Sequence, residues 1–272
     1  MLYQEHPPHP GLKNYIKCYW TLSIPESGSP HEGQYFLAEG LEFSFNLADP
    51  IEFAAHAPES ATVRRSCIWG PMTQPMRIKP TNRVEIFGVC FRPGGAYPFF
   101  FCPAAELVNA SAGIDDLWGA PGLGLVDGIQ YGCRTTRDRM DLLDRHFLHR
   151  LEQNRRQDAG LAAALDIVDA HKGQVSIDHL ARLAGLSRRQ LERCFKERVG
   201  MSPKQLCRSL RFKNVFKHLA TFTADSWVST ALACGYYDQS HMIRDFKHYT
   251  GTSPAAFFTR PGAGEQFFTG NF

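Results

Sequence analysis

The sequence predicts an α+β protein, in which an N-terminal antiparallel β-barrel with trailing helices precedes an all-α domain of two helix-turn-helix units. Three observations lead to this prediction. Short β-rich runs separated by turn residues fill the chain up to about residue 115. A helical period follows in residues 114–155. One helical unit then occurs twice in the last hundred residues. We place the domains at 1–155 and 156–262, with a C-terminal tail at 263–272.

Length, composition and charge limit the kinds of protein that this chain can be. With 272 residues, of which 43% are apolar and 12% aromatic, the chain is long enough for two domains with full cores. Residues 1–155 contain 14 Lys/Arg against 17 Asp/Glu, whereas residues 156–272 contain 16 against 10. A basic domain joined to a mildly acidic one is expected where one end contacts a polyanion, although a solvated helical surface gives the same balance.

The chain begins with a polar, proline-rich segment instead of a secretory apolar segment, and no apolar run approaches the ~18–20 residues of a membrane span. Its 8 cysteines include no C-x-x-C pair, and several lie in apolar runs, where a thiol packs as a small hydrophobe. We therefore expect a cytoplasmic protein with reduced thiols and no membrane partner. A redox-sensing cysteine is the alternative.

The N-terminal strands are predicted by local pattern. Residues 15–24 and 42–47 alternate apolar and polar side chains, and residues 83–91 are strongly apolar and β-rich. Turn clusters such as residues 25–30 separate them. The Arg-Pro-Gly-Gly sequence at 92–95 then ends the β pattern, because proline fixes φ and glycine permits positive φ. Short strands at this spacing predict a small antiparallel barrel or sandwich.

Aromatic side chains of this domain fit an apolar ligand pocket, and they fit an ordinary β core equally well. The ligand-binding candidates are Trp20, Phe43, Phe45, Phe87, Phe91 and Tyr97.

Residues 136–151 predict an amphipathic helix. Met140, Leu143 and Phe147 recur at three- and four-residue intervals, and charged residues fill the other face. The apolar stripe is expected to pack on the barrel, with a homodimer contact through 136–151 as the alternative. The polar run at 152–158 then marks the domain boundary.

The duplicated unit occupies residues 180–203 and 230–254. Its recurring residues are Ala181, Gly185, Arg193, Phe195, Lys196, Gly200, Ser202 and Pro203 in the first copy, and Ala231, Gly235, Arg244, Phe246, Lys247, Gly251, Ser253 and Pro254 in the second. The spacing is 50 residues up to the first glycine and 51 after it, so the second turn has one added residue. A small residue, a glycine turn, a capped helix and G-x-S-P predict helix-turn-helix units at 176–200 and 226–251.

The third helix of each unit is the candidate recognition helix. Ser187 is the expected N-cap of a helix at 188–199, and Asp238 is that of its counterpart. The residues expected at the cap and on the outward face are Ser187, Arg188, Arg189, Glu192, Arg193 and Lys196 in the first unit, and Gln239, Ser240, His241, Arg244 and Lys247 in the second. Cations at a helix start suit a major groove, although a solvated basic helix shows the same pattern. A connecting helix over 203–220 is expected to have a basic outer surface.

Two motifs give a family resemblance: G-L-S-R-R-Q-L-x-R-x-F-K-x-x-x-G-x-S-P, and A-x-x-C-G-Y-x-D-x-S-H-x-x-R-x-F-K-x-x-x-G-x-S-P. With them, residues 158–260 closely resemble the AraC/XylS family of bacterial transcription regulators. The resemblance implies seven helices whose two recognition helices enter successive major grooves. It places base contacts on Arg189, Glu192 and Arg193 in the first unit and on Gln239, Ser240, His241 and Arg244 in the second, with phosphate contacts at Ser187 and Lys196. Glu192 departs from the pattern, since a neutral polar residue is often found there.

The N-terminal half is similar to sensor domains found ahead of such regulators. The similarity rests on Tyr19-Trp20, residues 43–50, Gly70-Pro71, residues 91–95 and residues 115–119. It implies a cupin-like β-barrel with trailing helices and does not indicate a ligand.

We therefore expect a DNA-binding transcription regulator that binds a double-stranded operator, controlled by a small-molecule effector or by dimerisation, and contacting RNA polymerase if it is an activator. No cofactor and no enzymatic activity are expected. The alternative is a bifunctional DNA-binding enzyme of the metallo-cupin or cysteine alkyl-transfer repair type. Its histidine candidates, His6, His9, His31 and His56, show no H-x-H pattern, and the cysteines are dispersed. The pair His146 and His149 is more typical of a solvated helix face.

Overall fold

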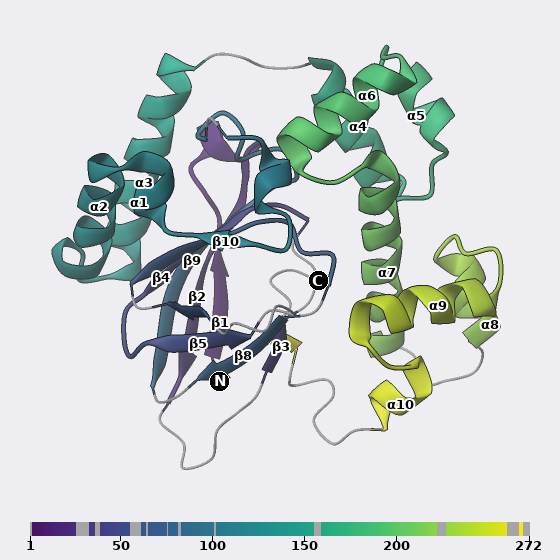
Figure 1. The fold of residues 1–272 in the computed structure, drawn as a ribbon, viewed down its shortest axis with the longest axis horizontal. Helices are drawn as coiled ribbons and strands as arrows, with labels where there is room; N and C mark the ends of the chain where they lie inside the picture. Colours follow the sequence, from purple (N-terminus) through teal and green to yellow (C-terminus); the bar gives the residue numbers. More distant parts are fainter. Residues whose placement is uncertain are drawn as a thin grey trace.

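The computed structural model describes residues 2–25, 33–35, 39–54, 61–63, 65–74, 76–80, 83–100, 102–154, 159–221, 227–259 and 267–268. Within these residues, two β-sheets and three helices form an N-terminal domain, and a group of helices joined by one long central helix forms a C-terminal domain (Figure 1). The α+β class predicted from the sequence is confirmed.

Two sheets make up the β part of the N-terminal domain. The first has the order β1 (Leu2–His6), β2 (Ile16–Ile24), β9 (Val84–Phe91), β4 (Glu42–Asn46), β7 (Ser66–Trp69) and β10 (Ser111–Ala112). The second has the order β11 (Phe267–Phe268), β3 (Gly33–Tyr35), β8 (Met76–Pro80), β5 (Ile51–Ala54) and β6 (Ala61–Val63). Their strands pair antiparallel except for β11, which runs parallel to β3 and brings the C-terminal tail to the N-terminal domain. Among the described strands the two sheets stay separate, so the closed β-barrel predicted from the sequence is replaced there by two open sheets.

The helices follow in chain order. The N-terminal domain has α1 (Ile114–Trp118), α2 (Ala120–Asp127) and α3 (Thr136–Gln153), with short 3-10 turns η1 (Pro10–Leu12) and η2 (Ala104–Leu107) and a π-helical turn η3 (Gly128–Gly132). The C-terminal domain has α4 (Ala159–Ala170), α5 (Ile177–Leu183), α6 (Arg188–Cys194), α7 (Pro203–Thr221), α8 (Trp227–Ala233), α9 (Gln239–Thr250) and α10 (Pro254–Phe258). The sequence predicted one regular helix at 188–199, whereas the structure continues α6 as a wider π-helical turn, η4 (Phe195–Val199).

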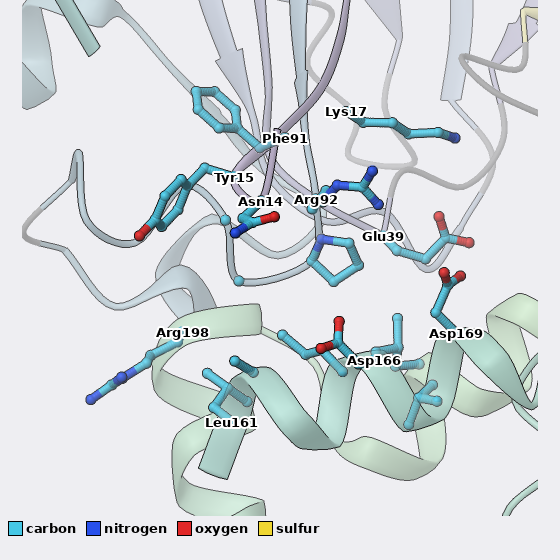
Figure 2. A pocket seen from close by; sticks show the side chains of 18 of the residues that line it. Asn14, Tyr15, Lys17, Glu39, Phe91, Arg92, Leu161, Asp166, Asp169 and Arg198 are labelled. Carbon is cyan, nitrogen blue, oxygen red and sulfur yellow. The ribbon is translucent and has the colours of Figure 1, made fainter. Parts of the chain in front are cut away.

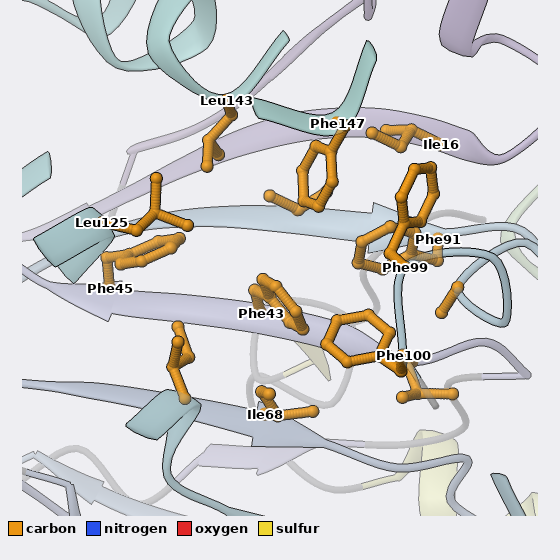
Figure 3. Close-up of a cluster of buried hydrophobic side chains, with 14 of the residues drawn as sticks. Ile16, Phe43, Phe45, Ile68, Phe91, Phe99, Phe100, Leu125, Leu143 and Phe147 are labelled. Atoms are coloured by element: carbon orange, nitrogen blue, oxygen red, sulfur yellow. The ribbon is translucent and has the colours of Figure 1, made fainter. Parts of the chain in front are cut away.

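Helices α1 to α3 cover one face of the first sheet and build its core (Figure 3). Phe43 lies at the centre, with the rings of Phe91, Phe100 and Trp118 edge-on to it at 5.0–5.4 Å between ring centroids. Phe147 of α3 packs into the same cluster, so the apolar stripe of α3 is used within the chain, as the first interpretation of residues 136–151 expected. The homodimer contact stays a prediction.

Most of the aromatic residues proposed to bind a ligand are part of this core. Phe43, Phe45 and Phe87 are fully buried and are surrounded by other core side chains. Phe91 is 1% exposed and belongs to the same core, although it also borders a cleft between the domains. Trp20 lies in a separate cluster with Cys18, Cys67, Trp69 and Cys90. Side chains alternate along a strand, which places neighbouring residues of β2 and β9 on opposite faces of the sheet.

No helix in the described ranges is both long and apolar enough to cross a membrane.

Candidate nucleic-acid interface

The first helix-turn-helix unit consists of α5, a turn at Gly185 and α6 with η4. Gly185 has a φ of 67°, a left-handed conformation that glycine adopts without a steric penalty. Ser187 caps α6 by accepting a hydrogen bond from the Gln190 amide at 3.3 Å, and the Gln190 side chain accepts one from the Ser187 amide at 2.9 Å. Leu191 and Phe195 are fully buried, so the opposite face of α6 is turned to solvent.

The second unit repeats this plan with α8, Gly235 at a φ of 76°, and α9. Asp238 caps α9 by accepting a hydrogen bond from the His241 amide at 2.6 Å. Tyr236 occupies the position of the first unit's Leu186 and is buried, whereas Tyr237, the added residue, is 88% exposed. The insertion therefore projects outward and leaves the spacing between the cap and the buried face of the helix unchanged.

The face of α6 that the sequence predicted to point outward is exposed. Its six candidates, Ser187, Arg188, Arg189, Glu192, Arg193 and Lys196, are all solvent-exposed. Arg188 is already engaged in ion pairs with Asp178 at 3.4 Å and Glu192 at 3.3 Å. Arg189, Arg193 and Lys196 form no side-chain hydrogen bond or ion pair with the described residues, so their charges are available to an external polyanion.

The corresponding face of α9 has fewer exposed cations. Ser240, Arg244 and Lys247 are exposed, whereas Gln239 and His241 are half-buried. The His241 ring packs edge-on against Tyr236, with 5.1 Å between ring centroids. The structure thus leaves Arg244 and Lys247 as the principal charged groups of this face.

Helix α7 differs from the sequence prediction of a basic outer surface. Arg208 donates to the buried carboxylate of Asp245 on α9 at 2.8 Å, and Arg211 donates to the carbonyl of Gly173 at 3.2 Å. Lys213 is buried as well. These cations therefore hold elements of the protein together, a role that helix periodicity alone does not reveal. The side chain of Lys217 lies outside the described part of the chain.

The N-terminal domain is docked against α7 by a buried charged cluster. The Lys213 ammonium forms an ion pair with Glu39, and the Ser209 hydroxyl donates to the other Glu39 oxygen at 2.8 Å. Lys213 and Glu39 are each 8% exposed. A carboxylate withdrawn from water to this extent is stabilised by a cation and a second hydrogen bond.

The domain contact continues along α4 and the η4 turn of the first helix-turn-helix unit. Gly94, in the Arg-Pro-Gly-Gly turn, has a φ of 71°, and a Cβ atom there would lie 3.2 Å from Leu165 of α4. Arg198 of η4 lies over the ring of Tyr97, 4.7 Å from its centroid. Tyr97, a ligand-binding candidate, is thus part of the contact between the domains.

A cleft of about 880 Å³ opens between the domains beside this contact (Figure 2). The N-terminal wall includes Lys17 and Arg92, and the wall formed by α4 includes Asp166 and Asp169. Burial lowers the pKa of the Lys17 ammonium, and the positive charge of Lys213 acts in the same direction. Tyr97 is the one ligand-binding candidate besides Phe91 whose atoms border the cleft.

The metal-enzyme alternative requires a cluster of metal ligands. Among the described residues, no group of three or more His, Cys, Asp or Glu side chains is placed to hold a metal ion. His31 and His56 lie outside those residues. His146 is not on a solvated face, because its ring packs against Trp118 at 5.1 Å and burial lowers its pKa to about 4. His149 lies at the surface, with its Nε2 2.9 Å from Gln153.

Comparison with known families gives two matches. Residues 180–260 match a family described as a helix-turn-helix domain, and residues 4–112 match a family described as a domain of unknown function. The HTH-type transcriptional regulator MtrA of Neisseria gonorrhoeae is 31% identical over 91 residues, 34% of this chain and 30% of the relative. The HTH-type transcriptional activator RhaS of Escherichia fergusonii is 30% identical over 105 residues, 38% of this chain and 37% of the relative. The chain therefore spans about a third of the length of these relatives.

Two solved structures show similarity over different fractions of the chain. A transcriptional regulator from Chromobacterium violaceum, described as AraC-type DNA-binding domain-containing, is 31% identical, with 38% of this chain and 95% of that chain covered and a TM-score of 0.33. ToxT from Vibrio cholerae O395 is 10% identical, with 88% of this chain and 96% of that chain covered and a TM-score of 0.48.

Proposed function

The chain belongs to the AraC family through its C-terminal helix-turn-helix domain, and on that premise we propose that it is a transcription regulator that binds a specific double-stranded operator through α6 and α9. The observation that supports this most is the pair of capped helices, Ser187–Gln190 and Asp238–His241, each following a left-handed glycine and each with a polar outward face. A helix of this kind fits the major groove of B-DNA, where base edges can be read.

The proposed roles differ between the two helices. In the first unit Arg189 and Arg193 read bases, with guanine O6 and N7 as the preferred acceptors, and Ser187 and Lys196 contact phosphates. Glu192 accepts from cytosine N4 or, by repelling phosphate, restricts how the helix enters the groove. Its ion pair with Arg188 neutralises part of that repulsion.

In the second unit Gln239, Ser240, His241 and Arg244 contact bases, and Lys247 contacts phosphate at the position equivalent to Lys196. Because α9 has fewer exposed cations than α6, it contributes less electrostatic affinity for DNA. Its main contribution is to the preference for one base sequence over another. The two units together read two successive stretches of groove on one side of the duplex.

Control by the N-terminal domain is the second part of the proposal. The domain docks on α7 and η4, so an effector or a dimer partner that changes the contact also changes how α6 is presented. A homodimer through 136–151 and, for an activator, contact with RNA polymerase belong to the same proposal. An operator-binding protein acts where the chromosome is, which places this one in the bacterial cytoplasm.

Selection of bound duplexes from a random pool tests the DNA-binding proposal. We expect the full chain to enrich two short conserved stretches about one helical turn apart, ~10 base pairs centre to centre. The Arg193→Ala variant should lose ~1–3 kcal/mol of affinity for the selected sequence while retaining weak binding to random duplex. Arg134→Ala, which removes an exposed cation of the N-terminal domain, is the matched control. Equal losses on specific and random DNA would show that Arg193 does not read bases.

A further inference from the structure

Two buried thiols face each other across neighbouring strands of the first sheet. Cys18 of β2 is the register partner of Cys90 of β9, and the two side chains are hydrogen-bonded. They are 4% and 7% exposed, and neither is in a disulfide. No part of the proposed DNA reading uses them.

Their placement meets the geometric needs of a disulfide. Residues directly opposite on antiparallel strands have Cα atoms ~4.5–5.5 Å apart, within the ~4.4–6.8 Å range that a disulfide spans. The ladder continues from Tyr19 paired with Val89 to Ile24 paired with Val84, so the strands already hold the two cysteines together. A register shift between Ile16 and Cys18 lies directly beside the pair and gives β2 room to adjust when a bond forms.

One of the two cysteines borders the interdomain cleft. Cys90 lines the interdomain cleft together with Lys17 and Glu42, whereas Cys18 does not border it. The hydrogen bond that the Cys90 thiol donates to Cys18 raises the pKa of Cys90, burial acts in the same direction, and the charge of Lys17 acts in the opposite direction. Reaction therefore requires a small oxidant that enters the cleft, and it proceeds more slowly than at an exposed thiolate.

We propose that Cys18 and Cys90 are a redox pair that a small hydroperoxide converts into an intramolecular disulfide. The Cys90 thiolate attacks one peroxide oxygen, the O–O bond breaks, and the departing alkoxide takes up a proton to give an alcohol, leaving Cys90 as a sulfenic acid. The Cys18 sulfur then attacks the Cys90 sulfur and displaces hydroxide, which leaves as water with the Cys18 proton. Two thiols lose two electrons, and the peroxide gains them.

The pair is linked to the contact between the domains through neighbouring backbone. Phe91, the residue after Cys90, donates its amide to the carbonyl of Leu41 at 3.0 Å. A Cβ atom on Gly40 would lie 2.1 Å from the Phe91 carbonyl oxygen, so this turn and β9 are in close backbone contact. Glu39, which binds Lys213, directly precedes that turn. A change in the backbone of β9 on disulfide formation is therefore expected to reach the segment that holds α7.

The test uses the full chain with the half-exposed Cys102 and Cys133 replaced by serine, which removes competing thiols. The reduced protein is treated with hydrogen peroxide, denatured in a maleimide reagent and digested for mass spectrometry. We expect a peptide joining Cys18 to Cys90, a loss of two maleimide-reactive thiols, and recovery of both with dithiothreitol. The Cys18→Ser variant should instead yield Cys90 as a sulfenic acid that dimedone traps.

Cys67 provides the matched control, because it is equally buried on the same face but lies beyond β4 and opposite Ser44. Cys67→Ser should form the Cys18–Cys90 bond as the parent does. A parent protein whose Cys18 and Cys90 stay fully reduced, or whose cysteines link at random, overturns the proposal. The readout is chemical, so it stands or falls separately from DNA binding. Comparison of operator affinity before and after oxidation then measures the effect on the domain contact, and an unchanged affinity would contradict that consequence.

Discussion

The two helix-turn-helix units share one plan but are anchored differently. The first unit contacts the N-terminal domain directly, through Val199 of η4, which a Cβ atom on Gly94 would meet at 3.6 Å, and through Arg198 over Tyr97. The second unit is held to the rest of the protein by α7, where Arg208 binds the buried Asp245. The two units therefore share the capped helix with its exposed polar face, but different contacts hold each unit to the rest of the protein. Signals from the N-terminal domain can act on α6 directly, whereas they reach α9 through α7.

The largest expected effect comes from breaking the anchor that both units share. Lys213→Met leaves the Glu39 carboxylate buried without its cation, which costs about 3–5 kcal/mol of folding free energy. Chemical denaturation monitored by Trp fluorescence measures the loss. The double variant Glu39→Gln with Lys213→Met should recover much of it, since no buried charge then remains. A matched control is Lys204→Met, which removes an exposed cation from the same helix. If the single and double variants are equally destabilised, the ion pair is not the anchor.

The second anchor gives a smaller, more local effect. Arg208→Met removes a charge-assisted hydrogen bond from Asp245, worth about 1.5–3 kcal/mol. One third of the Arg208 side chain is exposed, so water compensates in part. We expect hydrogen exchange to accelerate in α8 and α9 more than in α5 and α6. Equal acceleration in both units would show that α7 does not support the second unit selectively.

The sequence predicted the local structure of the two helix-turn-helix units more fully than the contacts that hold them to the rest of the protein. Caps, glycine turns and buried positions of both units follow from local chemistry, because Ser187, Asp238, Gly185 and Gly235 act on residues within a few positions of themselves. The contact of Lys213 with Glu39 joins residues 174 positions apart, and no local period reports it. For the same reason the sequence could not tell whether Phe43 and Phe91 belong to a pocket or to a core. In the structure, side chains from α1 to α3 pack with both residues in one core cluster.

The two reading surfaces can be compared directly by substitution. Arg193→Ala and Arg244→Ala remove equivalent residues, each expected to cost ~1–3 kcal/mol on the selected operator. Arg193 should lie at the upper end of this range, because Arg189 and Lys196 beside it have no hydrogen-bond or ion-pair partner among the described residues and attract the helix to the groove. Titration of operator variants mutated in one half at a time assigns each loss to a half. A larger loss for Arg244→Ala would reverse the proposed order of the two units.

The smallest effects concern the caps, and they separate folding from binding. Ser187→Ala and Asp238→Ala should each cost about 1 kcal/mol of folding free energy, whereas glycine at either position costs only a few tenths. Ser187→Gly therefore preserves α6 while removing a hydroxyl proposed to contact phosphate. If that hydroxyl binds DNA, Ser187→Gly weakens specific and random duplex binding to a similar degree, since phosphate contacts do not depend on sequence. Asp238→Gly serves as the control, because a carboxylate at that position contributes no attraction to phosphate. If Ser187→Gly leaves DNA affinity unchanged, Ser187 acts in the first unit as a cap alone, like Asp238 in the second.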